Sequence, residues 1–441
     1  MKNAQKSEKV WVEVSKENIL HNIKSLKGLL DSRPLRQSFS EASLRGNDTG
    51  EGKTLFMAVV KSNAYGHGLE EMNKICVQSK QVDWFGVDNV DEALALRGQG
   101  TKQPILILGY VPFDKINEAV ENNISFVAYN TELLDYLEKE IPARFAKASA
   151  RRASAGMTGG KREGKAKIHI KIETGTSRQG IEGKELLDFV AKAVKNPNIF
   201  IEGIYTHFAN IEDTTDPSYA MEQLKRFDEN IKMLDENFKY NPSQPPLTLR
   251  GGGRKKWSDG VIKHSACSAA FINYPETQFN MVRAGISLYG MWSSNETKLV
   301  AKQKNINLTL KPAITWHTQI VQIKKIPAGA SVSYGLTEKV KRDSRIAILP
   351  VGYYDGYDRG LSGIGEVLVN AKRARILGRI CMNMTIIDIT DIPDAKLFNC
   401  VVLLGQSGTE EITAEELAKK IGTINYEITT RINPLVKRII K

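Results

Sequence analysis

The sequence has no long hydrophobic run, few cysteines and no secretory leader pattern. Its longest strongly apolar stretch, Ile105 to Phe113, is far shorter than the roughly 20 residues of a membrane-spanning helix, so a membrane protein is excluded. Residues 1–17 are polar and mixed in charge, without the apolar core of a signal peptide. The four cysteines form no CxxC pair, which argues against a disulfide framework or a zinc ribbon and favours a reducing cytoplasm. No metal site is therefore expected.

The net charge of +12 is concentrated in three segments of the chain. Residues 33–53, 144–167 and 250–263 carry +1, +7 and +4, so the rest of the 441 residues is neutral. All three segments are rich in Gly, Ser, Ala or Thr, a composition that resists burial. We interpret them as basic surface insertions, although charge alone also supports weak binding of RNA or another anion. A specific nucleic-acid partner is not expected.

Most of the chain alternates short apolar runs with helical patterns. Eight such runs read as strands buried on both faces: residues 54–60, 84–87, 105–108, 124–128, 166–172, 199–205, 261–265 and 281–284. Eight strands with helices between them predict an α/β fold, a (β/α)8 barrel of the triosephosphate-isomerase type. A doubly wound open sheet is the alternative.

After about residue 308 the pattern changes to short, alternating, β-branched segments separated by Gly, Pro and Asp turns. This indicates a second domain that is mainly β and barrel-like, with one helix that Thr413 and Glu416 open as a capping box. The expected domains are residues 12–305, with insertions near 33–53, 144–167 and 241–262, and residues 306–441. The alternating residues 9–14 could add a strand to either domain.

A lysine ends the first barrel run, within the segment AVVKSNAYGHG from Ala58 to Gly68. Burial at the mouth of a barrel lowers the pKa of a lysine, and the neutral amine can form a Schiff base, although an isolated strand-end lysine is more often solvated. The segment closely resembles the pyridoxal 5'-phosphate motif of alanine racemases. The resemblance implies that Lys61 bonds to the cofactor and that Tyr65 binds its phosphate.

Two further barrel segments resemble this family, in the family's order. KIETGTSRQG, residues 171–180, implies that Arg178 reaches the cofactor's phenolic oxygen and the substrate carboxylate, next to a carbamylated Lys171. YTHFAN, residues 205–210, implies that His207 links the second base to an arginine beside the pyridine ring. Outside this series, Lys171 and Arg178 would be surface charges and His207 a structural histidine.

The last two barrel strands carry the segments HSACSAAF and VRAGISLYG. The resemblance implies that Ser268 and the backbone amides of Gly285 and Ile286 bind the phosphate. Cys267 stands where the family usually has Asn, so Ser265 competes for the hydrogen bond that the Asn would make.

An arginine in the last barrel strand, Arg283, resembles the one that faces the cofactor's pyridine nitrogen. Its permanent charge keeps that nitrogen unprotonated, which weakens the cofactor as an electron sink. The residue therefore favours reversible proton transfer over loss of carbon dioxide.

The second domain resembles the same family at four segments. SVSYGLTEK implies that Tyr334 is the second catalytic base, acting on the L isomer, and VGYYDGYDRGLS resembles the substrate entrance. GRICMNM implies that Met382 contacts the substrate carboxylate, with Asn383 where Asp is commoner. INYEI implies that Tyr426 is a further phosphate ligand.

The resemblance as a whole implies an alanine racemase that interconverts L- and D-alanine for peptidoglycan. Lys61 and Tyr334 would act on opposite faces of the cofactor, in a site shared across a head-to-tail homodimer. A racemase for serine or for several amino acids is an alternative, because the size of the pocket cannot be read from the sequence. A non-catalytic cofactor carrier is another, and Tyr334 argues against it because single-domain carriers of this superfamily lack the β domain.

Overall fold

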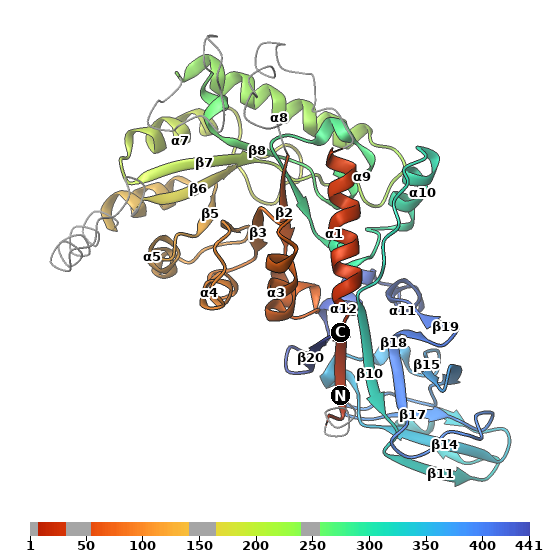
Figure 1. Cartoon of the computed structure of the whole chain (residues 1–441). Helices are drawn as coiled ribbons and strands as arrows, with labels where there is room; N and C mark the ends of the chain where they lie inside the picture. Colours follow the sequence, from red (N-terminus) through yellow and green to blue (C-terminus); the bar gives the residue numbers. More distant parts are fainter. Residues whose placement is uncertain (1–7, 32–53, 141–164, 240–255) are drawn as a thin grey trace. The chain divides into compact units, whose positions relative to one another are not determined.

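The computed structural model describes residues 8–31, 54–140, 165–239 and 256–441 (Figure 1). The chain forms two compact units that interleave along the sequence. The barrel unit comprises residues 22–61 and 76–310, and the β unit comprises residues 1–21, 62–75 and 311–441. Of the insertions predicted near 33–53, 144–167 and 241–262, residues 33–53, 144–164 and 241–255 lie outside the described residues. Residues 256–262 are not a surface insertion: Trp257 is buried in a short 3-10 helix, Trp257–Gly260, and Ile262 begins the barrel strand Ile262–His264. Residues 166 and 167 belong to the predicted strand 166–172 and not to the insertion, because they pair with Ile199 and Phe200.

The predicted barrel strands are all present, and each is parallel to its neighbour in the order β8-β7-β6-β5-β4-β3-β2-β9. Their bounds are β2 Leu55–Val59, β3 Trp84–Val87, β4 Ile105–Ile107, β5 Ser125–Ala128, β6 Ala166–Lys171, β7 Ile199–Tyr205, β8 Ile262–His264 and β9 Met281–Ala284. This sheet is nearly closed, which confirms the barrel over the open sheet. The strands are buried almost throughout, which explains why their sequences read as continuous apolar runs.

Helices follow the barrel strands along the chain (Figure 1). They are α3 (Leu69–Ser79), α4 (Val90–Gly98), α5 (Phe113–Glu121), residues 131–140, α7 (Gly183–Lys195), α8 (Ser218–Asn237), α9 (Ser268–Asn273) and α10 (Asn295–Gln303); α1 (Lys16–Asp31) precedes β2. In α7 the buried residues Leu186, Phe189, Val190 and Ala193 follow helical spacing and form the face that packs on β7. No helix in the described part of the chain is long and apolar enough to cross a membrane.

The β unit is built around a sheet in the order β16-β15-β18-β10-β1-β20, with β19 paired to β18. A second sheet has the order β11-β14-β17, and β12 pairs with β13. The strand bounds are β1 Val10–Val14, β10 Ile314–Gln319, β11 Gln322–Ile326, β12 Ser331–Val332, β13 Glu338–Lys339, β14 Ser344–Leu349, β15 Glu366–Val369, β16 Lys372–Arg375, β17 Thr385–Asp388, β18 Cys400–Ser407, β19 Glu410–Ile412 and β20 Lys437–Ile440. Strand β1 lies between β10 and β20, so the residues 9–14 segment joins the sheet of the β unit.

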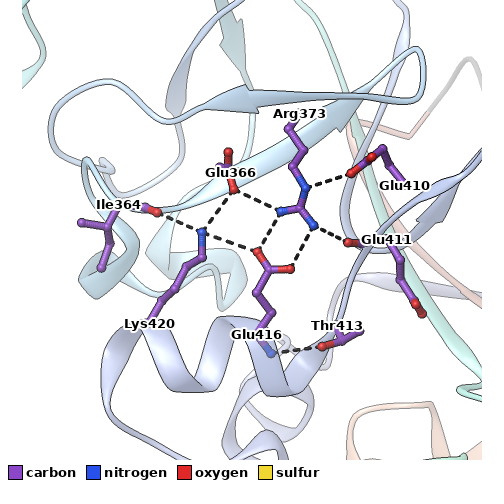
Figure 2. A network of polar contacts seen from close by, with 8 residues as sticks. All are labelled: Ile364, Glu366, Arg373, Glu410, Glu411, Thr413, Glu416 and Lys420. Carbon is purple, nitrogen blue, oxygen red and sulfur yellow. Dashed lines mark hydrogen bonds and ion pairs between the residues drawn. The ribbon is translucent and has the colours of Figure 1, made fainter.

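A network of charges joins strand β16, strand β15, strand β19 and helix α11 (Ala414–Ile421) on the β unit (Figure 2). The Arg373 guanidinium donates hydrogen bonds to Glu366, Glu410 and Glu416, at 3.1, 2.9 and 2.9 Å. Lys420 Nζ lies 3.3 Å from Glu366 and 3.4 Å from Glu416, so it joins the same carboxylates. Helix α11 begins at the predicted cap, where Thr413 Oγ1 accepts a hydrogen bond from the Glu416 backbone N–H at 3.0 Å.

We expect Arg373→Ala to destabilise the β unit by about 1–2 kcal/mol, because three carboxylates lose their shared cation. The matched control is Arg375→Ala on the same strand, since Glu338 is the one ion-pair partner of Arg375 among the described residues. Urea denaturation of the full chain should show a larger loss for Arg373→Ala than for Arg375→Ala, and the difference should shrink in high salt. Equal losses would show that the network adds nothing beyond a single surface ion pair.

Candidate functional site

Polar side chains gather where the barrel strands end. Lys61 follows β2, Lys171 ends β6, His207 follows β7, Ser268 follows β8, and Arg283 lies within β9. The carboxyl ends of parallel barrel strands meet at one face, and barrels of this type carry their chemistry there.

Arg283 is buried and held by backbone carbonyls on two neighbouring strand ends. Its Nη2 atom donates to Thr206 O at 2.9 Å and to Ser265 O at 2.8 Å, and Nη1 donates to His264 O at 3.1 Å. Two imidazole nitrogens, His264 Nδ1 at 2.7 Å and His207 Nδ1 at 3.3 Å, complete this set. Among the described residues, Arg283 Nε has no acceptor, so one N–H of a fixed cation is left for a bound group.

The histidines around Arg283 are neutral. Burial, and then the charge of Arg283, hold the pKa of His207 and of His264 well below the ordinary value. A neutral ring nitrogen can accept a hydrogen bond from the guanidinium, which a protonated one could not do.

Lys171 is also buried, beside the ring of Tyr205, and its Nζ lies 3.4 Å from Gln179 Oε1. Burial, followed by the positive charges of Arg178 and Arg283, lowers the pKa of Lys171 to about 8. A substantial fraction of this amine is therefore neutral near physiological pH, which an exposed lysine would not be.

The loop that carries Arg178 is organised by Glu173. One carboxylate oxygen of Glu173 accepts hydrogen bonds from the backbone N–H groups of Thr174, Gly175 and Thr176, at 2.9, 2.5 and 2.6 Å. Although burial opposes ionisation, these bonds lower the pKa of Glu173. Arg178 itself is exposed at the end of this loop, so its side chain is accessible to a ligand.

The residues predicted to bind phosphate on the barrel unit lie together. Ser268 Oγ accepts a hydrogen bond from Gly285 N at 2.9 Å, and Ile286 opens a short 3-10 helix whose first N–H groups have no partner within the helix. The competing candidate, Ser265, donates its hydroxyl to Thr277 O at 2.7 Å. Cys267 Sγ lies 3.9 Å from Glu212 Oε1, and burial raises the pKa of Cys267 to about 12, so this thiol stays protonated.

The backbone after Lys61 is left-handed at four consecutive residues. Ser62, Asn63, Ala64 and Tyr65 have φ between 52° and 56°, a conformation that costs L residues roughly 1–2 kcal/mol each. Within the β unit, the ring of Tyr65 lies 5.9 Å from that of Tyr426, which belongs to α12 (Asn425–Thr430). The two predicted phosphate tyrosines are therefore neighbours.

Three separate loops of the β unit come together around Tyr334. Ser333 Oγ donates to Arg379 O at 2.5 Å, and Tyr353 N and Tyr354 N donate to the carbonyls of Cys381 and Met382 at 3.1 and 3.0 Å. Tyr334 is 70% exposed and Met382 is 55% exposed. They belong to an exposed apolar group on these loops, comprising Tyr334, Leu336, Tyr353, Tyr354, Met382 and Met384.

Several residues of the site were not predicted from the sequence. His264 contacts Arg283, Glu173 organises the loop before Arg178, and Tyr205 stacks on His264 with ring centroids 4.7 Å apart. A histidine inside an otherwise apolar strand could have marked His264 as a candidate. Its contact with Arg283 could not be predicted, because that contact depends on how the strands are aligned.

Known proteins are similar to this chain over nearly its whole length. Residues 46–244 match the family described as "Alanine racemase, N-terminal domain", and residues 313–440 match "Alanine racemase, C-terminal domain". A protein of Leptospira interrogans named alanine racemase is 36% identical over 98% of this chain and 95% of its own, and one of Methanococcus maripaludis is 36% identical over 98% and 99%.

Solved structures agree with these sequence matches. The alanine racemase of Clostridium difficile has a TM-score of 0.78 at 30% identity, covering 99% of this chain and 96% of its own. The alanine racemase of Bacillus anthracis, solved with bound L-Ala-P, has a TM-score of 0.76 at 32% identity, covering 98% and 95%.

Proposed function

Since this chain belongs to the alanine racemase family, we propose that it interconverts L- and D-alanine with pyridoxal 5'-phosphate bound to Lys61. The observation that carries this proposal is Arg283, a buried cation whose Nη1 and Nη2 atoms have acceptors, whereas its Nε has none in the part of the chain that the structure describes. A pyridine nitrogen without a proton is an acceptor that fits this remaining donor. We further propose that the protein acts in the cytoplasm and that its D-alanine is used for peptidoglycan. The four free cysteines agree with a reducing compartment.

The residues present fit the other parts of the cofactor. Lys61 offers a primary amine for the aldehyde carbon. For the phosphate we propose Ser268 and the backbone amides of Gly285 and Ile286 on the barrel unit. Tyr65 and Tyr426 are the proposed phosphate ligands on the β unit, where their rings lie together.

When bound, the cofactor withdraws electrons from the substrate's α-carbon and so makes its C–H bond acidic. Arg283 limits this effect, because a permanent cation beside the ring nitrogen disfavours a second positive charge there. The protein therefore gives enough acidity for reversible proton transfer without favouring decarboxylation. His207, which accepts a hydrogen bond from Arg283 Nη2, would connect this arginine to the second base.

Racemisation needs one base on each face of the substrate, and we propose Lys61 and Tyr334 for these roles. Tyr334 lies on a loop with positive φ at Ser333, Gly335 and Leu336, and such strained turns commonly occur at functional sites. The exposed apolar group around Tyr334 is of the kind that a second subunit covers. We propose a head-to-tail homodimer in which each site takes Lys61 from one chain and Tyr334 from the other.

Arg178 and Met382 are the proposed contacts of the substrate carboxylate.

A panel of L-amino acids, including alanine and serine, tests the proposed substrate, with conversion to the D isomer followed by chiral chromatography. We expect alanine to be converted with the highest kcat/KM. A higher value for serine would replace the proposed substrate by the broader-specificity alternative, and the absence of any racemisation would contradict the proposal.

We propose that Lys171 is carbamylated, because a neutral buried amine reacts with carbon dioxide and the resulting anion suits a site rich in cations. With labelled bicarbonate and a fixed concentration of dissolved carbon dioxide, a carbamate NMR signal should rise as pH passes through about 8, the pKa of Lys171. The signal should be absent in Lys171→Arg. A signal that persists in this variant, or that rises only near pH 10.4 or so as for an ordinary lysine, would contradict the assignment.

A further inference from the structure

A line of buried polar side chains runs through the barrel from Glu202 to Arg283. Glu202 Oε2 lies 3.5 Å from His169 Nε2, His169 Nδ1 lies 3.0 Å from His264 Nε2, and His264 Nδ1 lies 2.7 Å from Arg283 Nη1. These residues belong to four successive strands: β6 carries His169, β7 carries Glu202, β8 ends at His264 and β9 carries Arg283. The proposed catalytic roles use neither Glu202 nor His169.

Packing fixes both imidazole rings in this line. The ring of His264 is stacked on Tyr205 at 4.7 Å with an interplanar angle of 1°, and His169 meets the edge of Trp84 at 5.5 Å. Strand β7 has a glycine next to Glu202, and a Cβ atom at Gly203 would lie 2.3 Å from His169 Nδ1. Glycine at this position leaves the space that the His169 ring occupies, so the neighbouring strand is shaped around the ring.

With Arg283 at one end of the line and Glu202 at the other, a single direction of proton donation satisfies every contact. An arginine only donates, so His264 Nδ1 must accept and the single proton of this neutral ring lies on Nε2. That proton points at His169 Nδ1, which accepts in turn, and this places the His169 proton on Nε2. This last N–H has no hydrogen-bond partner with good geometry among the described residues, and the Glu202 carboxylate lies 3.5 Å from it, within ion-pair distance.

Glu202 is a suitable anionic end for this line. Burial opposes its ionisation, yet the contacts with His169 and Ser125 keep the pKa of Glu202 below the ordinary value. The Ser125 hydroxyl donates to the same oxygen, Oε2, and Lys167 Nζ lies 3.9 Å from Oε1. Arg283, at the other end, has no carboxylate within ion-pair distance among the described residues.

We infer that Glu202 is a positioning residue, which fixes the tautomer of His169, through it that of His264, and thereby the orientation of Arg283. The inference rests on the proposed function in one respect: Arg283 must face the cofactor's pyridine nitrogen for its orientation to affect turnover. Without an acceptor at position 202, His169 can carry its proton on Nδ1, which would oppose the Nε2 proton of His264. Arg283 would then lose an imidazole acceptor or move.

The test compares Glu202→Leu, which removes the acceptor, with Glu202→Gln, whose amide oxygen can still accept from His169. In protein with isotope-labelled histidine, NMR should show His169 and His264 as single Nε2–H tautomers in the wild type and in Glu202→Gln. Glu202→Leu should show mixed tautomers at both rings and a changed absorption spectrum of bound cofactor. Its kcat should fall roughly 10–100-fold, with Glu202→Gln much closer to the wild type.

Two further variants separate positioning from general stability. Asp235→Asn is the matched control, because Asp235 also accepts from a serine hydroxyl, that of Ser258, but has no contact with a histidine among the described residues; its spectra should be unchanged. His169→Phe keeps a ring beside Trp84 and breaks the line, so it should alter the His264 tautomer even where Glu202→Leu fails to fold. An unchanged His264 tautomer in folded Glu202→Leu or His169→Phe would overturn the inference. A wild-type protein without racemase activity would instead contradict the proposed function, since the tautomers are read independently of turnover.

Discussion

Replacing Lys61 by alanine should abolish racemisation, with a loss of roughly 10⁴-fold or more. Under the proposed assignment two functions are lost at once: the amine that bonds to the cofactor and the base on one face of the substrate. Lys61→Arg is the sharper variant, because it keeps a positive charge and a long side chain but cannot bond to an aldehyde or give up a proton near neutral pH. Both variants should therefore be inactive.

The matched control for these variants is Lys115→Ala, which removes a partly exposed surface lysine from helix α5. Its activity should equal that of the wild type. Circular dichroism and thermal unfolding should show that all three variants are folded, so that lost activity reflects lost chemistry. Substantial racemisation by Lys61→Arg would exclude Lys61 as the residue that bonds to the cofactor.

Tyr334→Phe should lower turnover by roughly 10²–10⁴-fold, the usual contribution of one positioned acid–base group. The variant removes a hydroxyl and keeps the ring, and the Tyr334 side chain is 70% exposed on its own unit, so the fold should be unaffected. Cofactor should still bind, because Lys61 and the proposed phosphate ligands are unchanged. The loss should differ between the two isomers: the rate of α-proton exchange should fall more for L-alanine than for D-alanine. Solvent-deuterium exchange from each isomer measures this, and equal losses would refute the assignment of Tyr334 to the L side.

Mixing the two inactive chains tests whether the site is shared. A heterodimer of Lys61→Ala and Tyr334→Phe has one intact site and one doubly altered site if the two bases come from different chains. Random exchange should then restore up to about a quarter of the wild-type activity, since half of the dimers are mixed and each has one intact site. No recovery despite demonstrated subunit exchange would place both bases on one chain.

The barrel could be predicted because its strands are buried on both faces. Runs such as Thr54 to Val60 are almost continuously apolar, as strands buried on both faces are, so they can be recognised from the sequence. Lys61 is conspicuous because it ends such a run. The left-handed turn that follows could not be predicted in the same way. Ser62, Asn63, Ala64 and Tyr65 include no glycine, and positive φ at such residues is imposed by tertiary contacts.

Contacts between strands that lie far apart in the sequence could not be predicted either. The pairing of β1 with both β10 and β20 brings the two ends of the chain into one sheet, and a local alternating pattern does not specify a partner. The contact of His264 with Arg283 depends in the same way on the relative register of β8 and β9. The sequence therefore indicated which residues are candidates for the chemistry, whereas the residues that contact these candidates, such as His264, became apparent only from the structure.

The central claim is that Lys61 holds pyridoxal 5'-phosphate, and borohydride reduction tests it most directly. Reduction fixes the cofactor on the amine that bonds to it, and digestion followed by mass spectrometry identifies the labelled peptide. We predict one pyridoxyl group per chain, on Lys61, and none in Lys61→Arg. A label on another lysine, or purified protein that retains no cofactor when pyridoxal 5'-phosphate is supplied, would contradict the account.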